Sequence, residues 1–237
     1  MESVVKDLPN LSVYENLVHV PHFLTAALVV VSTVILVARY YPEKFGGESL
    51  NQWYDSFGLE GVTANLSILV LGFMITQYLY TVYVEPMVGG WKPVYFVLLF
   101  LVVQILHDIL FYYAVVKPLP KGMNDMIDVC KKYVDENGVS VITANSLVVI
   151  VATGITFALE SAPMAVAVVI AALAAYSVPF GINTKTQGTY RWVSPEEKAK
   201  QEEKVKEKVQ EKKEITPWDL LKPQVQQRGA QSSSLLD

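Results

Sequence analysis

The chain has 237 residues, of which 52% are hydrophobic and only 18% charged, and its mean hydropathy is +0.32. Its 19 basic and 23 acidic side chains are unevenly placed, because 11 basic and 9 acidic ones lie after Phe180. The part before Phe180 is too apolar for a soluble core, and the part after it is too polar to bury. The composition predicts an all-α, polytopic membrane protein with a charged, partly helical C-terminal tail. The small net charge of the tail argues against a nucleic-acid-binding arm.

Five apolar stretches are long enough, or nearly so, for a helix to cross the hydrocarbon layer, which takes about 20 residues. They are residues 23–38, 62–83, 94–116, 139–159 and 164–180. The first and the last are short, so four spanning helices plus one interfacial helix is the alternative. Only residues 160–163 join the last two stretches. This short link predicts a tight helical hairpin, with Pro163 in the first turn of the fifth helix.

The five stretches divide the chain into an N-terminal segment (1–22), a transmembrane bundle (23–180) and a hydrophilic tail (181–237). With five spans, 2 Lys and Arg residues fall on the side of the N-terminus and 17 on the side of the tail. Cytoplasmic loops of membrane proteins carry the excess of Lys and Arg. We therefore expect the N-terminus on the non-cytosolic side and the tail on the cytosolic side.

Two segments between the stretches are expected outside the hydrocarbon layer. Residues 49–57 contain Trp53 and Tyr54, and such rings prefer the membrane surface. Further along, Asn124 is a suitable N-cap and Gly138 a suitable stop for a short amphipathic helix. This helix either lies on the cytosolic membrane face or caps the end of the bundle. Its expected apolar face consists of Met126, Ile127, Cys130, Tyr133 and Val134.

The third stretch contains a polar group of residues, because Gln104, His107 and Asp108 share one helical face near its middle. A charge at the bilayer centre costs about 2.5–3.5 kcal/mol on insertion scales. We therefore expect Asp108 to point into the bundle and to find a hydrogen-bond partner there. The candidate partners are Asn65 and Gln77 on the second stretch and Asn145 on the fourth.

Three roles are open for this group: a proton or ion pathway, a metal site, or hydrogen bonding between helices. A pathway needs a relay of ionisable groups, and the five stretches contain only His107 and Asp108. A metal site needs three or four ligands, and His19 and His22 lie at the edge of the first stretch. The sequence thus favours hydrogen bonding. We expect a protein that is not an enzyme and has no catalytic residue, metal or cofactor.

The tail carries two features of its own. Residues 194–197 form a helix-start signal with a capping-box glutamate, and a charged helix is expected over 194–214. Residues 215–223 follow as a hydrophobic hook motif bounded by prolines. Its Trp218, Leu220 and Leu221 have no core to join and are expected to bind a partner, since exposed Trp is a frequent anchor. The alternative is that the hook motif lies on the membrane surface.

Residues 50–155 resemble a group of multi-span membrane proteins encoded by nucleocytoplasmic large DNA viruses, including chlorella-virus-type algal viruses. The resemblance is carried by the segments NQWYDSFGLEGVTANLSILVLGF, QILHDILFYYAVVKPLPKGMNDMIDVCKKYVDENG and ANSLVV. Within them, the residues that carry it are Trp53 and Tyr54, His107 and Asp108, Lys117, Lys121 and Gly122, and Asn137 and Gly138. The tail lies outside it.

This resemblance implies no activity, but it implies a virion in which a lipid bilayer lies beneath an icosahedral capsid. The sequence then suggests a membrane-embedded minor capsid protein that tethers the inner membrane to the capsid. Its partners would be the lipid bilayer and the major and other minor capsid proteins, and a homo-oligomer is compatible with this role. During assembly it would reside in an ER-derived host membrane. The alternatives are a membrane enzyme or proton-linked transporter using His107 and Asp108, and a membrane-biogenesis factor absent from virions.

Overall fold

The computed structural model describes residues 8–15, 17–42 and 44–185. The predicted tail helix (194–214) and the hook motif (215–223) therefore lie outside the described residues. Every regular element within the described part is helical, which confirms the predicted all-α class. In chain order the elements are α2 (Val20–Tyr40), α3 (Gly47–Leu79), the π-helical turn η1 (Tyr80–Val84), α4 (Glu85–Val88), α5 (Pro93–Phe111), the π-helical turn η2 (Tyr112–Val116), α6 (Asp125–Asn137), α7 (Ser140–Glu160) and α8 (Met164–Asn183).

Five helical units are long and apolar enough to cross a membrane: Val20–Tyr40, Gly47–Val88, Pro93–Val116, Ser140–Glu160 and Met164–Asn183. The two stretches that looked short in the sequence are longer in the structure. Helix α2 begins at Val20 with Pro21 in its first turn, where the missing N–H of proline costs nothing. Helix α8 continues past Phe180 to Asn183. Five spanning helices are thus confirmed by length and composition, without recourse to the alternative of four.

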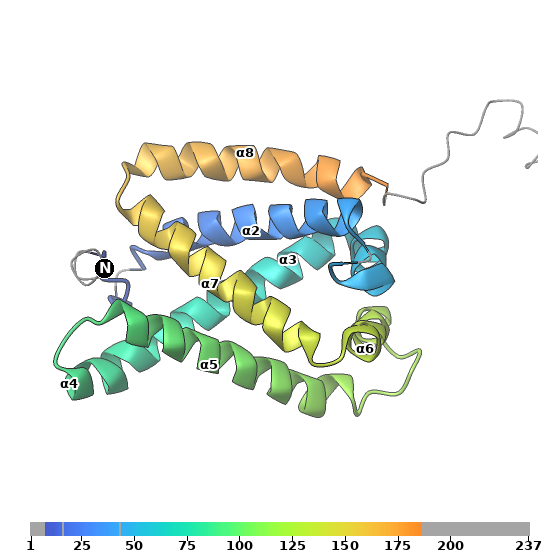
Figure 1. Ribbon diagram of the computed structural model, residues 1–237, viewed down its shortest axis with the longest axis horizontal. Coiled ribbons are helices and arrows are strands. Elements are labelled where there is room, and N and C mark those ends of the chain that lie inside the picture. Colours follow the sequence, from blue (N-terminus) through green and yellow to red (C-terminus); the bar gives the residue numbers. More distant parts are fainter. Residues whose placement is uncertain (1–7, 16, 43, 186–237) are drawn as a thin grey trace, which may run out of the picture. The chain divides into compact units, whose positions relative to one another are not determined.

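Helix α2 occupies the centre of the bundle. It packs against α8, α3 and α7, while α5 lies on α7 and α3 (Figure 1). Half of the most apolar window of α2 is buried, compared with 17% to 28% for the other four units. The outer helices therefore leave most of their apolar surface uncovered by protein, as helices facing lipid do.

The predicted hairpin of α7 and α8 is only partly right. A turn at residues 161–163 does reverse the chain, with Pro163 as the residue that precedes α8. The two helices then diverge, and α8 packs mainly on α2, not on α7 (Figure 1). The prediction of a packed hairpin was wrong because a short link fixes only the ends of two helices. Where a helix then packs depends on surface shape, and α2 offers α8 a longer contact.

Aromatic rings fill the middle of the core between α2, α3 and α5. Phe23 stacks on Phe73 with ring centroids 4.1 Å apart, and Phe96 and Phe100 contact Phe73 at 5.9 Å and 6.1 Å. All four rings are fully buried. Aromatic pairs contribute roughly 0.5–1.5 kcal/mol beyond the area that they bury. This cluster fixes the spacing of the three helices.

Helix α3 contains a sharp kink at Gly58, whose φ of 48° and ψ of −122° are not helical. The kink separates residues 47–57 from the spanning part of the helix and lets them pack beside α6 at one end of the bundle (Figure 1). Tyr54 is 1% exposed, and its hydroxyl accepts a hydrogen bond from Asn65 Nδ2 at 3.1 Å. The expectation that Tyr54 lies at the membrane surface was therefore wrong, whereas Trp53 is half-buried against Phe57.

Helix α6 begins and ends as its sequence predicts. The Asn124 side chain accepts a hydrogen bond from the Ile127 N–H at 3.1 Å, and Gly138 ends the helix at a positive φ of 55°. The helix packs on α3, η2 and α7, and so caps the bundle. Its most buried side chain is Val129, at 7% exposure. We call the end of the bundle that α6 covers the α6 end, and the opposite end, where α4 lies, the α4 end.

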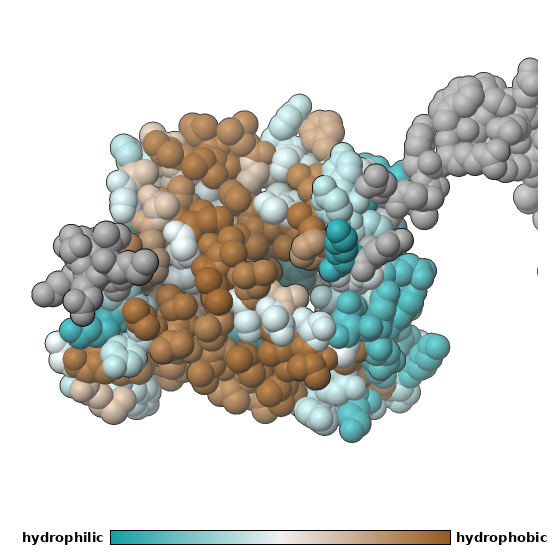
Figure 2. Space-filling view, viewed as in Figure 1, coloured by the Kyte–Doolittle hydropathy of each residue, from teal (hydrophilic) through white to brown (hydrophobic). Residues whose placement is uncertain are grey.

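The surface of the bundle is apolar around its middle and polar at the α6 end. Figure 2 shows hydrophobic side chains over α8, α7 and α5, and hydrophilic ones gathered over α6. The most exposed large apolar residues in the spanning helices include Leu106, Leu110, Leu147, Leu173 and Tyr176. Patches of this extent on a protein surface mark contact with a membrane or another protein. Together with the length of the helices, they identify a membrane protein.

Candidate functional site

The Asp108 cluster (Gln104, His107, Asp108 and Asn145) joins α5 to α7. Gln104 Nε2 donates to Asp108 Oδ1 at 2.8 Å, and Asn145 Nδ2 donates to Asp108 Oδ2 at 2.9 Å. The Gln104 side chain is in reach because it lies one helical turn before Asp108. Gln104 is 4% exposed and the Asp108 side chain 15% exposed. Each carboxylate oxygen thus has an amide donor, and one donor comes from the neighbouring helix.

His107 and Tyr133 complete the surroundings of Asp108. His107 Nδ1 lies 3.3 Å from Asp108 Oδ1, and its ring stacks on Phe111 with centroids 5.8 Å apart. Burial raises the pKa of the Tyr133 phenol on α6, and the negative charges of Asp108 and Glu136 raise it further. The Asp108 carboxylate therefore lies towards the α6 end of the bundle, where its charge raises the pKa of Tyr133 on α6.

The other two predicted members, Asn65 and Gln77, have different partners. Asn65 donates to Tyr54 across the Gly58 kink, and Gln77 Nε2 donates to the Leu11 carbonyl at 2.8 Å. Gln77 is fully buried and holds the N-terminal segment against α3. Of the three candidate partners of Asp108, the structure brings only Asn145 to it. Sequence spacing could not show which of the three candidates bonds to Asp108, because each lies on a face of its helix that points inward.

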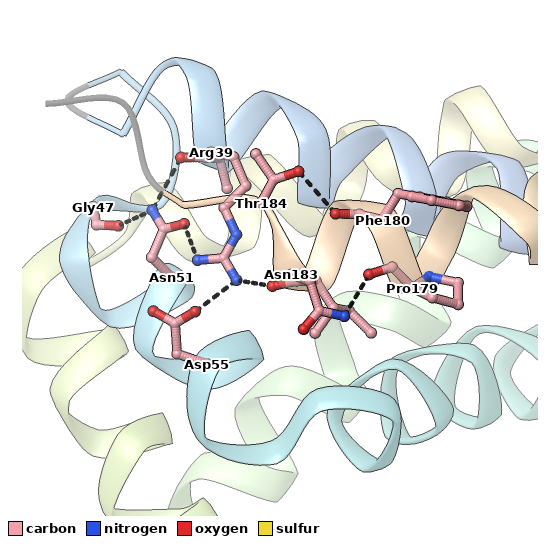
Figure 3. Close-up of polar contacts among 10 residues, drawn as sticks. Arg39, Gly47, Asn51, Asp55, Pro179, Phe180, Asn183 and Thr184 are labelled. Carbon is pink, nitrogen blue, oxygen red and sulfur yellow. Dashed lines mark hydrogen bonds and ion pairs between the residues drawn. The ribbon is translucent and has the colours of Figure 1, made fainter. Parts of the chain in front are cut away.

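The Arg39 cluster (Arg39, Asn51, Asp55 and the Ile182 carbonyl) lies at the α6 end and joins three helices (Figure 3). Arg39 Nη1 donates to Asn51 Oδ1 at 2.9 Å, and Nη2 donates to Asp55 Oδ1 at 2.7 Å. Nη2 also donates to the Ile182 carbonyl at 2.9 Å, in the last turn of α8. The Arg39 side chain is 1% exposed, whereas Asp55 is 56% exposed. The planar guanidinium suits such a fork of acceptors.

Asn51 orients this cluster. Its Nδ2 donates to the Ala38 carbonyl at 2.9 Å, so its Oδ1 is left to face Arg39 (Figure 3). The last turn of α2, the first segment of α3 and the end of α8 are thereby tied at one point. From the sequence, Arg39 was assigned only to the basic residues on the side of the tail. The one usable signal was the spacing of Asn51 and Asp55, which lie one helical turn apart after a short loop.

The His–Glu cluster (His19, His22 and Glu160) lies at the α4 end, where α2 begins and α7 ends. His19 Nδ1 forms a hydrogen bond with Glu160 Oε1 at 2.7 Å. His22 Nδ1 lies 2.9 Å from the same oxygen, in an orientation that makes no hydrogen bond. The three side chains are between 9% and 13% exposed. The sequence places the two histidines at the edge of a span and Glu160 in a turn, and nothing in it predicts that they meet.

A fourth polar contact attaches α6 to α3. The Glu136 carboxylate accepts hydrogen bonds from the backbone N–H groups of Glu48 at 2.8 Å and Ser49 at 2.9 Å, and from the Ser49 hydroxyl. Partial burial favours the neutral acid, but the hydrogen bonds from Ser49 and Glu48 outweigh it and lower the pKa of Glu136. Gly47, at a φ of 64°, leaves room for the carboxylate, which a Cβ would strike. A helix N-terminus favours such an anion.

No family model, no curated protein and no solved structure matches the chain. Across the described residues, no group of three or more His, Cys, Asp or Glu side chains, the His–Glu cluster included, is arranged to hold a metal ion. The predicted partner-binding residues Trp218, Leu220 and Leu221 lie outside the described residues. The clusters are therefore interpreted from their own geometry.

Proposed function

We propose that this chain is a structural membrane protein whose bundle anchors the C-terminal tail to a bilayer. The observation that supports this most is that each carboxylate oxygen of Asp108 accepts a hydrogen bond from a side-chain amide, one from Gln104 and one from Asn145. Interhelical hydrogen bonds of this kind contribute about 0.6 kcal/mol each, and at most about 2. A carboxylate with an amide donor on each oxygen serves to hold α5 to α7. It is less suited to exchanging protons along a pathway.

The Arg39 cluster supports the anchoring role. It holds the Ile182 carbonyl in the last turn of α8, and so fixes the C-terminal end of the last spanning helix. A pull on the tail would be shared between α8, α2 and α3 through one guanidinium. Because Asp55 is 56% exposed, loss of the guanidinium should cost less than the roughly 3–5 kcal/mol of breaking a fully buried charge pair.

In the proposed setting the bilayer is the inner membrane of a large DNA virus and the tail faces the capsid. Support comes from the resemblance of residues 50–155 to membrane proteins of such viruses and from the partition of 2 against 17 basic residues. Trp218, Leu220 and Leu221 would bind a major or minor capsid protein. A Trp side chain is a suitable anchor because ordering its two χ angles costs little and its apolar surface is large.

The tail can be tested with two tryptophan variants. Purified virions are analysed for the chain by mass spectrometry, and their membranes are then floated and assayed for bound capsid protein. We expect the chain in virions and less capsid protein on membranes of the Trp218→Ala variant. Trp192→Ala removes the other tail tryptophan, outside the hook motif, and should retain wild-type binding. Absence of the chain from virions would favour a biogenesis factor, and wild-type binding by Trp218→Ala would refute the tether.

The rival class, a proton-linked transporter, is tested in reconstituted vesicles. A pH gradient is imposed and its decay is followed with an internal dye, for the wild-type chain and for Asp108→Asn. The structural proposal requires equal decay for both proteins and for empty vesicles. Faster decay with the wild-type chain, abolished by Asp108→Asn, would replace the structural proposal with a transport function.

A further inference from the structure

An exposed face of α5 leads to a lysine at the α6 end of the bundle. Leu106, Leu110 and Tyr113 are exposed, and they lie about one helical turn apart on one face of α5 and η2. Lys117 directly follows η2, and its Nζ lies 5.2 Å from the centre of the Tyr113 ring. The face therefore passes from aliphatic side chains through an aromatic ring to an ammonium group.

The link from η2 to α6, residues 117–124, lies at the α6 end and is attached to α6 by two hydrogen bonds (Figure 1). Lys131 Nζ donates to the Leu119 carbonyl, and the Gly122 N–H donates to Asp128 Oδ2 at 2.7 Å. Gly122 has a φ of 87°, a conformation that side chains with a Cβ disfavour. The link is therefore fixed before it binds anything, which lowers the entropic cost of binding a ligand.

The two lysines of this link, Lys117 and Lys121, are exposed, and within the described part of the chain neither forms an ion pair. Of the acidic side chains nearby on α6, Asp128 turns one oxygen to the Gly122 N–H and buries the other. Asp125, in the first turn of α6, is exposed. The exposed charge around the link is therefore positive on balance, and its lysines are available to an external anion.

We propose that the exposed face of α5 and the link together form a binding site for an anionic phospholipid. The acyl chain lies along Leu106 and Leu110, and Tyr113 lies at the level of the glycerol. Lys117 and Lys121 hold the anionic headgroup. Tyrosine prefers the membrane interface, and lysines near the end of a spanning helix extend towards the headgroups. Basic groups beside spanning helices bind anionic lipids. The inference does not depend on what the tail binds.

The charge of the site selects among lipids, and its apolar face distinguishes a lipid from a soluble anion. Phosphatidylcholine carries a cation that offsets its phosphate, whereas phosphatidylglycerol leaves the charge of its phosphate unmatched. Two exposed lysines bind a free phosphate weakly in water, because the Coulomb energy is small there and is screened by salt. An acyl chain on Leu106 and Leu110 adds contacts that a free phosphate cannot make. The ligand is therefore a lipid and not inorganic phosphate.

The test titrates the full-length protein in a zwitterionic detergent with phosphatidylglycerol or with phosphatidylcholine of the same chain length, and native mass spectrometry counts the bound lipid. We expect phosphatidylglycerol to bind more tightly. Lys117→Gln and Lys121→Gln should each weaken its binding about fivefold, the effect of one lysine at an anionic surface. Phosphatidylcholine should bind equally to the wild type and the variants. Lys44→Gln is the matched control, because Lys44 is exposed at the same end of the bundle but lies between α2 and α3.

Four results would overturn the proposal. They are equal affinity for the two lipids, wild-type affinity in the double variant of Lys117 and Lys121, an equal loss in Lys44→Gln, and displacement of the lipid by an equal concentration of inorganic phosphate. The variants should keep the melting temperature of the wild type, because the substituted lysines are exposed. A tail that binds no capsid protein would leave every one of these results unchanged, so this proposal and the tether fail separately.

Discussion

Individual polar residues join helices at points where apolar packing alone would not determine which helices associate. Asp108, Arg39 and Glu160 each meet donors or acceptors from another helix. In a membrane, apolar side chains gain little from leaving lipid for protein, so specific hydrogen bonds and close packing determine which helices associate. These three residues therefore specify neighbours: α5 with α7, α2 with α3 and α8, and α2 with α7.

Asp108→Asn tests the first of these contacts. The new amide can accept from one of Gln104 and Asn145 but must present an N–H to the other, so one buried donor loses its acceptor. We expect the free energy of unfolding in detergent to fall by about 1–3 kcal/mol. A double-mutant cycle with Asn145→Ala should give a nonzero coupling. Asn183→Ala, which removes an exposed amide bonded only to the Pro179 carbonyl, is the control and should change little.

Arg39→Lys tests the second contact while keeping the charge. A lysine has a single nitrogen and cannot reach Asn51, Asp55 and the Ile182 carbonyl together. We expect a loss of about 2–3 kcal/mol, less than the 3–5 for a fully buried pair, because Asp55 remains half exposed. Thermal unfolding in detergent measures the loss, and Lys44→Met, at a nearby exposed lysine, should leave it near zero. A wild-type midpoint for Arg39→Lys would contradict the role of the fork.

The sequence predicts the residues that act locally better than those that act at a distance. Asn124 and Gly138 function within one helical turn, and both were predicted correctly. The Arg39–Ile182 and His19–Glu160 contacts join residues far apart in the chain, and no periodicity reports such a pairing. Tyr54 was placed wrongly for a related reason. The single residue Gly58 redirects the segment that carries it, and its effect is not visible in composition.

At the scale of elements, α3 is the helix that departs most from a simple span. Its kink at Gly58 depends on a positive φ that side chains with a Cβ disfavour. We expect Gly58→Ala to destabilise the bundle by about 1–2 kcal/mol. Gly154→Ala is the matched control, since both glycines have open space around a new Cβ but only Gly58 has a positive φ. The control should be neutral or slightly stabilising, and equal effects of the two would disprove the conformational explanation.

The attachment of α6 to α3 should depend on pH. Because the pKa of Glu136 is lowered in the folded state, its contribution to stability is present above the ordinary value of 4.5 and is lost as the pH falls through the folded value. We expect the difference in melting temperature between the wild type and Glu136→Gln to be largest near neutral pH and to vanish in acid. A difference that persists below the folded pKa would show that shape, not charge, matters at this site.

For the whole molecule, the number of helices was predictable, but their arrangement was not. Length and hydropathy identify five spans because the thickness of the hydrocarbon layer sets the length of a spanning helix and its apolar interior sets the composition. They do not distinguish α2 at the centre from α8 at the edge, since apolar side chains suit lipid and protein contacts equally. The polar residues that would have revealed α2 as the central helix, among them Thr25 and Ser32, mostly bond to its own backbone. Ser32 also donates to the Ala174 carbonyl of α8 at 3.4 Å, but its acceptor is a backbone group, which no residue type in the sequence marks.

The central place of α2 has a consequence for how the chain is made. Helix α2 is the first of the five spans to leave the ribosome, yet two of its three packing partners, α7 and α8, are the last. Until residue 182 has been synthesised, the Ile182 carbonyl cannot accept the hydrogen bond from Arg39. We expect chains released after residue 163 to be degraded by membrane quality control faster than the full chain. Pulse-chase labelling measures this, and equal half-lives would mean that α2 is stable before its last partner arrives.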